Sequence, residues 1–328
     1  MSSQPMDPAF APLVKHPREV LRDPYSVRQK IAATRQGTTS LSSNPALEIE
    51  DHHLSPSTED KTQPPIRIYR SSEAKGPLPA LLYLHGGGFF SGDQFTDETQ
   101  CAYYAEHARC AVTSIGYRLA PEEPFPAALN DCYRALEFLW SHSKQLNIDR
   151  ARIAIGGSSS GANLAAAVAL LTRDRSGPAL CFQMLLVPVL DDRLETQSAR
   201  EFTDVPDFAR PEAEVMWRWY LGESAADASP YAAPARASDL SGLPAAYILC
   251  AGLDPLRDEG LDYARRLTAA GIAVELHLVP SIPHGFASIR SAAISQRLLT
   301  EQVEVLCGAF GWQRKPSPEP AQTSKARA

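Results

Sequence analysis

The sequence predicts an α/β fold in which a mostly parallel central sheet is flanked by helices. Strand-like and helix-like segments alternate along most of the chain, and the central strand-like segments are apolar on both faces, as is typical of strands covered from both sides. The 328 residues, 44% of them hydrophobic and 21% charged, are enough to bury a large core. Residues 1–65 and 191–243 interrupt the alternation, and neither segment has room for a sheet of its own.

The alternation begins at residue 66. Before it, residues 24–35 are expected to form a helix, whereas residues 38–65 are polar and rich in proline and serine, which favours a loop or linker. Strands are expected at residues 66–69, 80–84, 110–117, 152–155, 181–190, 245–250 and 274–279. Helices are expected at residues 102–109, 127–143, 162–173, 259–270 and 288–310.

Charge and cysteine spacing exclude several functions. Lys and Arg number 32 against 38 Asp and Glu, and a net charge of −6 argues against nucleic-acid binding. The six cysteines form no CxxC pair, so the usual metal and redox spacings are absent. No stretch resembles a signal peptide or a membrane span. We therefore expect a cytoplasmic protein without a metal or nucleotide cofactor, and a homodimer stays open.

The sharpest motif is a G-x-S-x-G pattern at residues 157–161, between an expected strand and an expected helix. Glycines two before and two after a serine let strand and helix approach at a strained turn, and the serine then stands at the positive end of the helix. Of three consecutive serines, Ser159 alone has both glycines, which makes it the candidate nucleophile. The alternative is an ordinary glycine-serine turn at a helix N-cap.

A nucleophilic serine needs a base, and the base needs a carboxylate. His284 follows the strand at 274–279 through a short loop, at the end of a strand where open α/β sheets place their sites. Asp254 follows the strand at 245–250 and is the candidate acid, with Asp191, also after a strand, as the alternative. Among serine hydrolases, the chain order Ser159, Asp254, His284 belongs to the α/β-hydrolase fold.

The sequence His85-Gly86-Gly87-Gly88 follows the strand at 80–84. Acyl transfer builds negative charge on a carbonyl oxygen, and N–H donors must already face it. We expect the N–H groups of Gly87 and Gly88 to supply two donors and Ser160, the residue after the nucleophile, a third. Gly86 then shapes the turn and His85 orients the loop. The alternative is that the glycines merely form a tight turn.

Five motifs together resemble the hormone-sensitive-lipase-like family of α/β-hydrolases, which includes many bacterial and fungal carboxylesterases. They are HGGGF at 85–89, YRLAPE at 117–122, GSSSG at 157–161, DPLRD at 254–258 and HGF at 284–286, in that family's order. The resemblance covers about residues 65–310. One departure is that the family usually has Asp or Thr before the nucleophile and Ala after it, where this chain has Ser158 and Ser160.

The resemblance implies a catalytic triad of Ser159, Asp254 and His284, an oxyanion hole at Gly87, Gly88 and Ser160, and a helical cap. The implied division is an N-terminal cap segment and linker at 1–65, a catalytic domain at 66–190 and 244–312, a cap insertion at 191–243 and a disordered tail at 313–328. Phe208, Trp217 and Trp219 in the insertion would suit an apolar substrate if they line the pocket; residues 216–220 equally fit the face of a core helix.

We therefore expect a serine carboxylesterase that hydrolyses short- to medium-chain or small apolar esters through an acyl-enzyme intermediate. Two alternatives stay open. One is a non-catalytic small-molecule receptor on the same scaffold, a class that typically lacks the histidine base. The other is a hydrolase of lactone, amide or thioester bonds. Activity is expected to fall at acid pH, because a protonated His284 cannot accept a proton.

Overall fold

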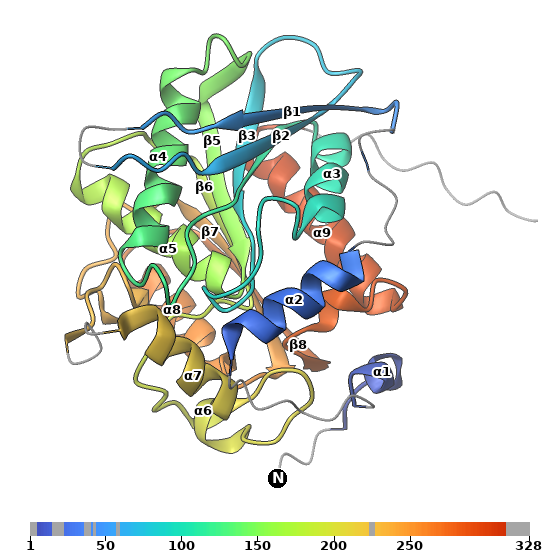
Figure 1. Ribbon diagram of the computed structural model, residues 1–328, viewed down its shortest axis with the longest axis vertical. Coiled ribbons are helices and arrows are strands. Elements are labelled where there is room, and N and C mark those ends of the chain that lie inside the picture. Colours follow the sequence, from blue (N-terminus) through green and yellow to red (C-terminus); the bar gives the residue numbers. More distant parts are fainter. Residues whose placement is uncertain are drawn as a thin grey trace, which may run out of the picture.

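An eight-stranded sheet runs through the computed structural model, which describes residues 5–14, 23–35, 41, 44–56, 60–222 and 227–312. The strand order is β1-β2-β4-β3-β5-β6-β7-β8 (Figure 1). The strands are β1 (Leu47–His53), β2 (Pro65–Ser71), β3 (Leu78–Leu84), β4 (Ala111–Ile115), β5 (Ile148–Ser158), β6 (Phe182–Leu186), β7 (Ala245–Leu253) and β8 (Val274–Pro283). The tail at 313–328, expected to be disordered, lies outside the described residues.

Most of this sheet is parallel, as the sequence predicted. Strands β3 to β8 pair in parallel, whereas β2 pairs antiparallel with both β1 and β4. Leu84 at the end of β3 pairs with Gly157, and Ser158 at the end of β5 pairs with Leu186. Because the carboxyl ends of parallel strands meet at one edge of the sheet, the loops that carry the predicted site residues emerge together.

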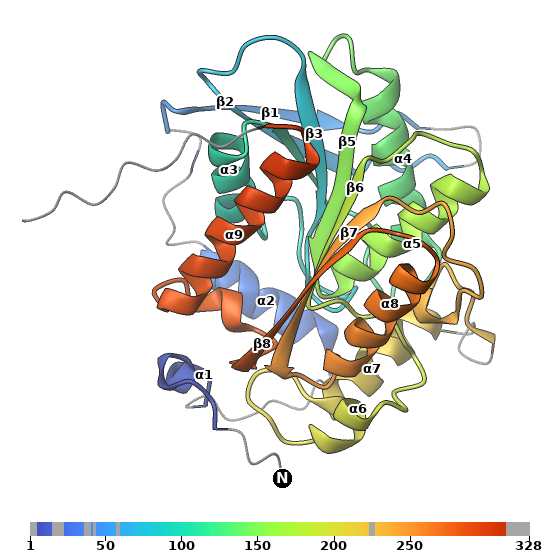
Figure 2. The ribbon, with the colours of Figure 1, turned by 180° about the vertical axis from the view of Figure 1, so that it is seen from behind.

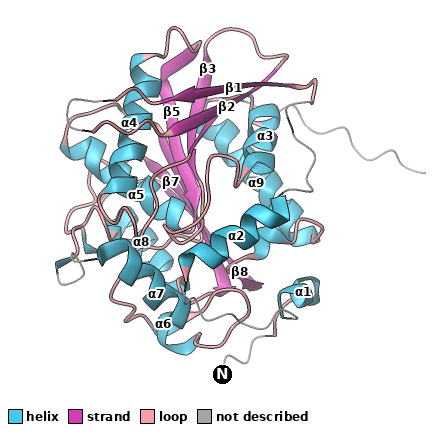
Figure 3. Cartoon of the chain, viewed as in Figure 1, coloured by secondary structure: helices cyan, strands magenta, loops and turns pink. Residues whose placement is uncertain are grey.

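Helices cover both faces of the sheet (Figures 2 and 3). One face carries α3 (Glu98–His107) and α9 (Ala293–Ala309); the other carries α4 (Ala127–Ser141), α5 (Ser160–Asp174) and α8 (Arg257–Ala269). Strand β3 contributes to both cores, since Leu82 and Leu84 pack on the α4–α5 side while Leu81 and Tyr83 pack on the α3–α9 side. This burial on both sides explains the continuous apolar character of the central strands.

The N-terminal segment differs from expectation at one place. Helix α2 (Pro24–Arg35) confirms the predicted helix, but the loop or linker expected at 38–65 is wrong for 47–53, where β1 pairs with β2 over seven positions. Leu47 and Ile49 are partly buried against the core, whereas Glu50 and Asp51 bind arginines of β2. An edge strand with so many polar residues owes its structure to pairing with β2 rather than to an apolar pattern.

The insertion at 191–243 contains α6 (Gln197–Glu201), α7 (Arg210–Leu221) and a 3₁₀ turn at Pro234–Arg236. Together with α2, helices α6 and α7 lie near the end of the sheet at which β7 and β8 terminate (Figure 1). Met216, Trp217 and Tyr220 on α7 are buried, and the Tyr220 ring stacks on Phe89 with centroids 3.7 Å apart. The apolar face of α7 therefore packs into the core directly over the residue that follows the glycine loop.

Candidate active site

Ser159 lies at a sharp turn between β5 and α5. Its backbone has φ 57° and ψ −120°, a conformation that a residue with a side chain rarely adopts. The flanking glycines allow the turn: a Cβ on Gly157 would lie 2.5 Å from the carbonyl oxygen of Leu84, and one on Gly161 only 2.0 Å from the same atom. The G-x-S-x-G spacing thus reflects backbone atoms in close approach, and the turn presents the Ser159 hydroxyl beyond the end of β5.

The structure brings the three predicted triad residues together. His284 Nε2 lies 2.8 Å from Ser159 Oγ, and His284 Nδ1 lies 2.7 Å from Asp254 Oδ2. The other oxygen of Asp254, Oδ1, accepts the backbone N–H of Leu256 at 2.9 Å, and the aspartate is 1% exposed. With Nδ1–H donating to Asp254, Nε2 is left to accept the proton of Ser159. Strand β8 runs to Pro283, so His284 follows the strand directly and not through the four-residue loop expected from the sequence.

The alternative acid, Asp191, is directed elsewhere. Its two carboxylate oxygens accept hydrogen bonds from Arg193 at 2.7 and 2.8 Å. Asp191 lies in the chain that leaves β6, so the end-of-strand argument placed it at the correct edge of the sheet. The side chain nevertheless binds Arg193, and the geometry favours Asp254 as the partner of His284.

Opposing effects act on the imidazole. Burial lowers the pKa of His284, but the Asp254 carboxylate, with a smaller contribution from Asp207, outweighs it and holds the pKa above its ordinary value. Sequence reasoning missed Asp207. It lies in the insertion, just before α7, and no motif or strand end marks it.

The glycine loop lies against the serine turn. A Cβ on Gly86 would be 3.1 Å from the carbonyl oxygen of Ser158 and 3.6 Å from Cβ of Ser159. Gly87 and Gly88 have φ of +120° and +64°, and within the described part of the chain their N–H groups have no hydrogen-bond acceptor. Ser160 is the first residue of α5, so its N–H has no acceptor within the helix. The loop and the helix start therefore offer unpaired donors beside Ser159.

The side chain of His85 holds the glycine loop in place. Its Nδ1–H donates to the carbonyl oxygen of Gly86 at 2.7 Å, and its ring stacks on Tyr117 with centroids 4.1 Å apart. Tyr117 in turn donates its hydroxyl proton to the carbonyl oxygen of His85 at 2.8 Å. These contacts agree with the interpretation that His85 orients the loop, and they give Tyr117 of the 117–122 motif a structural role beneath it.

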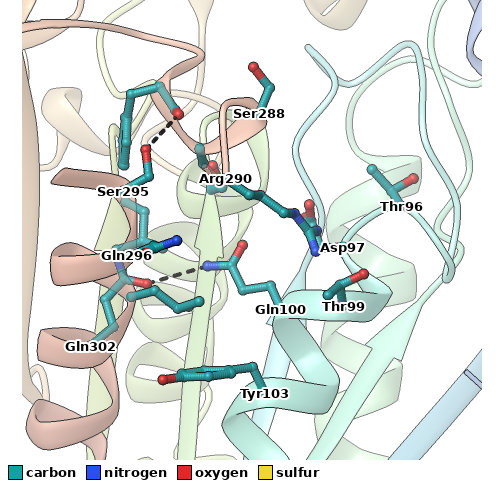
Figure 4. A pocket seen from close by; sticks show the side chains of 15 residues that line it. Thr96, Asp97, Thr99, Gln100, Tyr103, Ser288, Arg290, Ser295, Gln296 and Gln302 are labelled. Atoms are coloured by element: carbon teal, nitrogen blue, oxygen red, sulfur yellow. Dashed lines mark hydrogen bonds between the residues drawn. The ribbon is translucent and has the colours of Figure 1, made fainter. Parts of the chain in front are cut away.

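A pocket of about 420 Å³ lies between α3 and α9 (Figure 4), and no triad residue is among those that line it. Its lining includes Ser158, one residue before the nucleophile, and Phe286, two residues after the histidine. Leu186 and Leu299 add apolar surface, and polar side chains of α3 and α9 face each other across it: Thr99, Gln100, Tyr103, Ser295, Gln296 and Gln302 (Figure 4).

The aromatic residues of the insertion do not line this pocket. Instead, the ring centroids of Phe208 and His284 lie 4.7 Å apart. The ring centroids of Trp217 and Phe89 lie 5.9 Å apart, and Trp219 contacts Phe90 edge-on with centroids 4.9 Å apart. These aromatics therefore pack on the histidine and on the two residues that follow the glycine loop.

The described ranges contain no group of three or more His, Cys, Asp or Glu side chains that could hold a metal ion. Among the same residues, no helix is long and apolar enough to cross a bilayer. All six cysteines are free thiols, and five of them are buried.

Comparisons with known proteins agree with this geometry. A family model described as alpha/beta hydrolase fold matches residues 81–288. The esterase LipI of Mycobacterium tuberculosis is 36% identical over 287 residues, covering 85% of this chain and 88% of LipI. The solved structure of a bacterial heroin esterase superposes with a TM-score of 0.88 at 39% identity, covering 93% of this chain and 98% of that one. Esterase LipW from Mycobacterium marinum gives a TM-score of 0.86 at 39% identity, covering 93% and 96%. The chain therefore belongs to the alpha/beta-hydrolase family, among the hormone-sensitive-lipase-like carboxylesterases that its motifs resemble.

Proposed function

We propose that this protein is a serine carboxylesterase that hydrolyses short- to medium-chain or small apolar esters through an acyl-enzyme intermediate. The observation that carries the proposal is the unbroken hydrogen-bonded chain from Asp254 through His284 to Ser159, with contacts of 2.7 and 2.8 Å. The unpaired N–H groups of Gly87 and Gly88 beside it support the same chemistry. The esterase activity named for the relatives supports the choice of an ester bond.

In the first half of the reaction, Ser159 gives its hydroxyl proton to His284 Nε2 and attacks the ester carbonyl carbon. The carbonyl π electrons move to oxygen, and the N–H groups of Gly87, Gly88 and Ser160 stabilise the resulting oxyanion. Asp254 keeps the proton of the imidazole on Nδ1 and stabilises the imidazolium. His284 then gives its Nε2 proton to the leaving alcohol oxygen, the C–O bond breaks, and the acyl group stays on Ser159.

In the second half, a water molecule replaces the alcohol. His284 accepts a proton from the water, whose oxygen attacks the acyl carbon, and the same donors stabilise the second oxyanion. The proton returns from His284 to Ser159 Oγ as the acyl–oxygen bond breaks. The carboxylic acid leaves, and the enzyme regains its starting protonation state.

The pocket between α3 and α9 supports the proposed substrate size. Its volume of about 420 Å³ is in the range of small-molecule sites. Leu186, Phe286 and Leu299 give it apolar walls, and its lining also includes Ser158, the neighbour of the nucleophile. A short or medium acyl or alkyl group on one side of the ester fits such a space.

The test is hydrolysis of p-nitrophenyl acetate, butyrate and octanoate by the wild type, Ser159→Ala and Ser158→Ala, the last being the same change one residue away. Loss of the nucleophile is expected to lower kcat about 10⁴- to 10⁶-fold, leaving a residual rate from the oxyanion donors. Ser158→Ala should retain most turnover. A phosphonate ester should label Ser159, located by peptide mass. Turnover that survives in Ser159→Ala would refute the proposal.

The same experiment separates the alternatives. Absent labelling together with tight binding of a small acid would identify a receptor, an outcome that the contact of His284 with Ser159 argues against. Parallel assays of lactones, amides and thioesters determine which bond is preferred.

We also propose that the segments at 1–65 and 191–243 act as a cap, with residues 66–190 and 244–312 as the catalytic domain. The support is that α2, α6 and α7 gather at one end of the sheet and that Phe208 packs on the ring of His284 (Figure 1). A cap of this kind predicts that changes in α2 or α7 alter substrate preference more than changes in α4 of the catalytic domain.

Finally, we propose a cytoplasmic location and a homodimer. Six free cysteines support a reducing compartment. Strand β8 ends the sheet order, and its Leu276 and Leu278 are 42% and 49% exposed, which suits pairing with a second copy. Cell fractionation tests the location. Light scattering of the wild type and of a Leu276→Glu/Leu278→Glu variant tests the dimer; a monomeric wild type would refute it.

A further inference from the structure

The insertion places one carboxyl group against the backbone of the histidine loop. Asp207 has φ 71°, in the left-handed region, and its carboxyl lies beside Gly285. A Cβ on Gly285 would be 2.2 Å from Oδ2 and 2.6 Å from Cγ of Asp207. Gly285 itself has φ −81°, which any residue adopts. A side chain at position 285 would therefore displace the Asp207 carboxyl, although the backbone conformation there would allow it.

Two successive residues of the insertion hold this loop. The Asp207 carboxyl lies against the backbone of Gly285, and the centroid of the Phe208 ring lies 4.7 Å from that of the imidazole at an interplanar angle of 32°. Ser159 contacts Nε2 of the imidazole, and Asp254 binds the other ring nitrogen, Nδ1. The imidazole thus has partners from the loop after β7 and from the insertion.

The charged groups around His284 are mainly acidic. Asp254 contributes from the loop after β7 and Asp207 from the insertion, while Glu212 of α7 acts on Asp207. Part of Asp207 is exposed to solvent, but burial of its carboxyl raises the pKa of this group. The charge of His284 lowers this pKa, and the charges of Asp254 and Glu212 raise it. The charges of His284 and Asp207 therefore each act on the pKa of the other.

We propose that Asp207 is a positioning residue for His284, which orients the histidine loop through Gly285 and acts as a second carboxylate that stabilises the imidazolium. The inference rests on the proposed function, since imidazolium forms when Ser159 is deprotonated. Asp254 keeps the hydrogen bond to Nδ1, and Asp207 adds negative charge next to the residue that follows His284.

The decisive variant is Asp207→Asn. Asparagine tolerates the left-handed backbone as aspartate does and has nearly the same size and shape beside Gly285, so the change removes charge and little else. Without the second carboxylate, the imidazolium is less stable. The acid limb of the kcat/KM profile is expected to move to lower pH by about 0.5 to 1 unit, and the plateau kcat to fall a few-fold.

The matched control is Asp204→Asn, the same charge change at an exposed residue of the same insertion. It should leave the acid limb where the wild type has it. Equal shifts in both variants would mean that overall charge is the cause, and an unshifted limb in Asp207→Asn would mean that Asp207 carries no charge when His284 titrates. Either result overturns the inference.

A second measurement needs no turnover. In the Ser159→Ala background, NMR titration of the His284 ring protons reports the pKa of the imidazole with and without Asp207→Asn. A lower pKa in the double variant supports the inference, and an unchanged pKa refutes it. Failure of the proposed function would be seen separately, as wild-type protein that does not hydrolyse esters, and thermal melting checks that each variant is folded.

Discussion

Arg28 of helix α2 donates a hydrogen bond from Nε to the carbonyl oxygen of Phe90 at 2.5 Å, joining the N-terminal segment to the backbone just after the glycine loop. The same guanidinium donates to the carbonyl oxygen of Ala120 at 2.8 Å and to both carboxylate oxygens of Glu122 at 2.6 and 2.8 Å. Since Phe90 is two residues beyond Gly88, one side chain links α2 to the loop that carries the proposed oxyanion donors.

Replacing Arg28 with alanine should therefore lower kcat, by about tenfold, because the loop loses the contact that orients it. Arg28→Lys should recover only part of the loss, since an ammonium cannot reproduce the forked contacts. Esterase kinetics check the effect against Arg150→Ala, an exposed arginine near the start of β5, at the opposite end of that strand from Ser158. Equal kinetics for the two alanine variants would contradict the link.

The same contact makes a prediction about acid. The hydrogen bond from Arg28 is the main cause that lowers the pKa of Glu122 to about 2. A lowered folded-state pKa contributes stability above the ordinary value of 4.5, and this contribution is lost as pH falls towards about 2. Acid unfolding followed by circular dichroism should therefore begin at higher pH in Arg28→Ala than in the wild type. The effect is small, because Glu122 is partly exposed.

Asp254→Asn should lower kcat about 10⁴-fold with little change in KM, because an amide favours the wrong tautomer of His284 and cannot stabilise its charge. Asp191→Asn is the matched comparison, the same change at the other carboxylate that follows a strand, and should retain most activity. Steady-state kinetics distinguish the two. A larger loss in Asp191→Asn would reverse the assignment of the acid.

The raised pKa of His284 sets the direction of the pH profile. The base must be neutral to accept a proton, so kcat/KM should fall as pH drops through this pKa, with a midpoint above the ordinary value of about 6.5. By linkage, the protonated imidazole contributes stability below about 6.5 that is lost as pH rises through the folded-state pKa. Rates on a non-ionising ester between about pH 5 and 9 test this; a midpoint below 6.5 would argue against it.

Gly87→Ala should lower kcat about 10²- to 10³-fold by displacing an oxyanion donor. Gly87 has φ +120°, and a Cβ there would lie 2.2 Å from the carbonyl oxygen of Ser91. Gly76→Ala is the control: Gly76 also has a positive φ, +76°, but nothing lies within 4 Å of a Cβ. It should cost about 1 kcal/mol of stability and leave kcat intact. Similar kcat losses in both variants would remove the special role of the loop.

Leu299→Trp should narrow the pocket between α3 and α9, because Leu299 lines it. We expect kcat/KM for octanoate esters to fall about tenfold or more relative to acetate. Thr300→Trp, at the next residue of α9, which does not line the pocket, should leave the ratio unchanged. An unaltered chain-length preference in Leu299→Trp would show that the acyl chain of the ester binds outside this pocket.

The sequence by itself determined the parallel sheet and the residues that meet at its edge. The turn at Ser159 could be predicted because its requirement for glycines is local, and the loops carrying Asp254 and His284 because carboxyl ends of parallel strands gather at one edge. Both rules depend on chain neighbours and strand direction alone.

The tertiary structure decided what depends on distant segments. Strand β1 is an edge strand whose polar composition resembles a loop until β2 pairs with it. Arg28 reaches Phe90, and Asp207 reaches Gly285, only after the whole core has packed and brought α2 and the insertion to the same end of the sheet. Such contacts leave no local periodicity or spacing in the chain, because their energy comes from the approach of segments that are far apart in sequence.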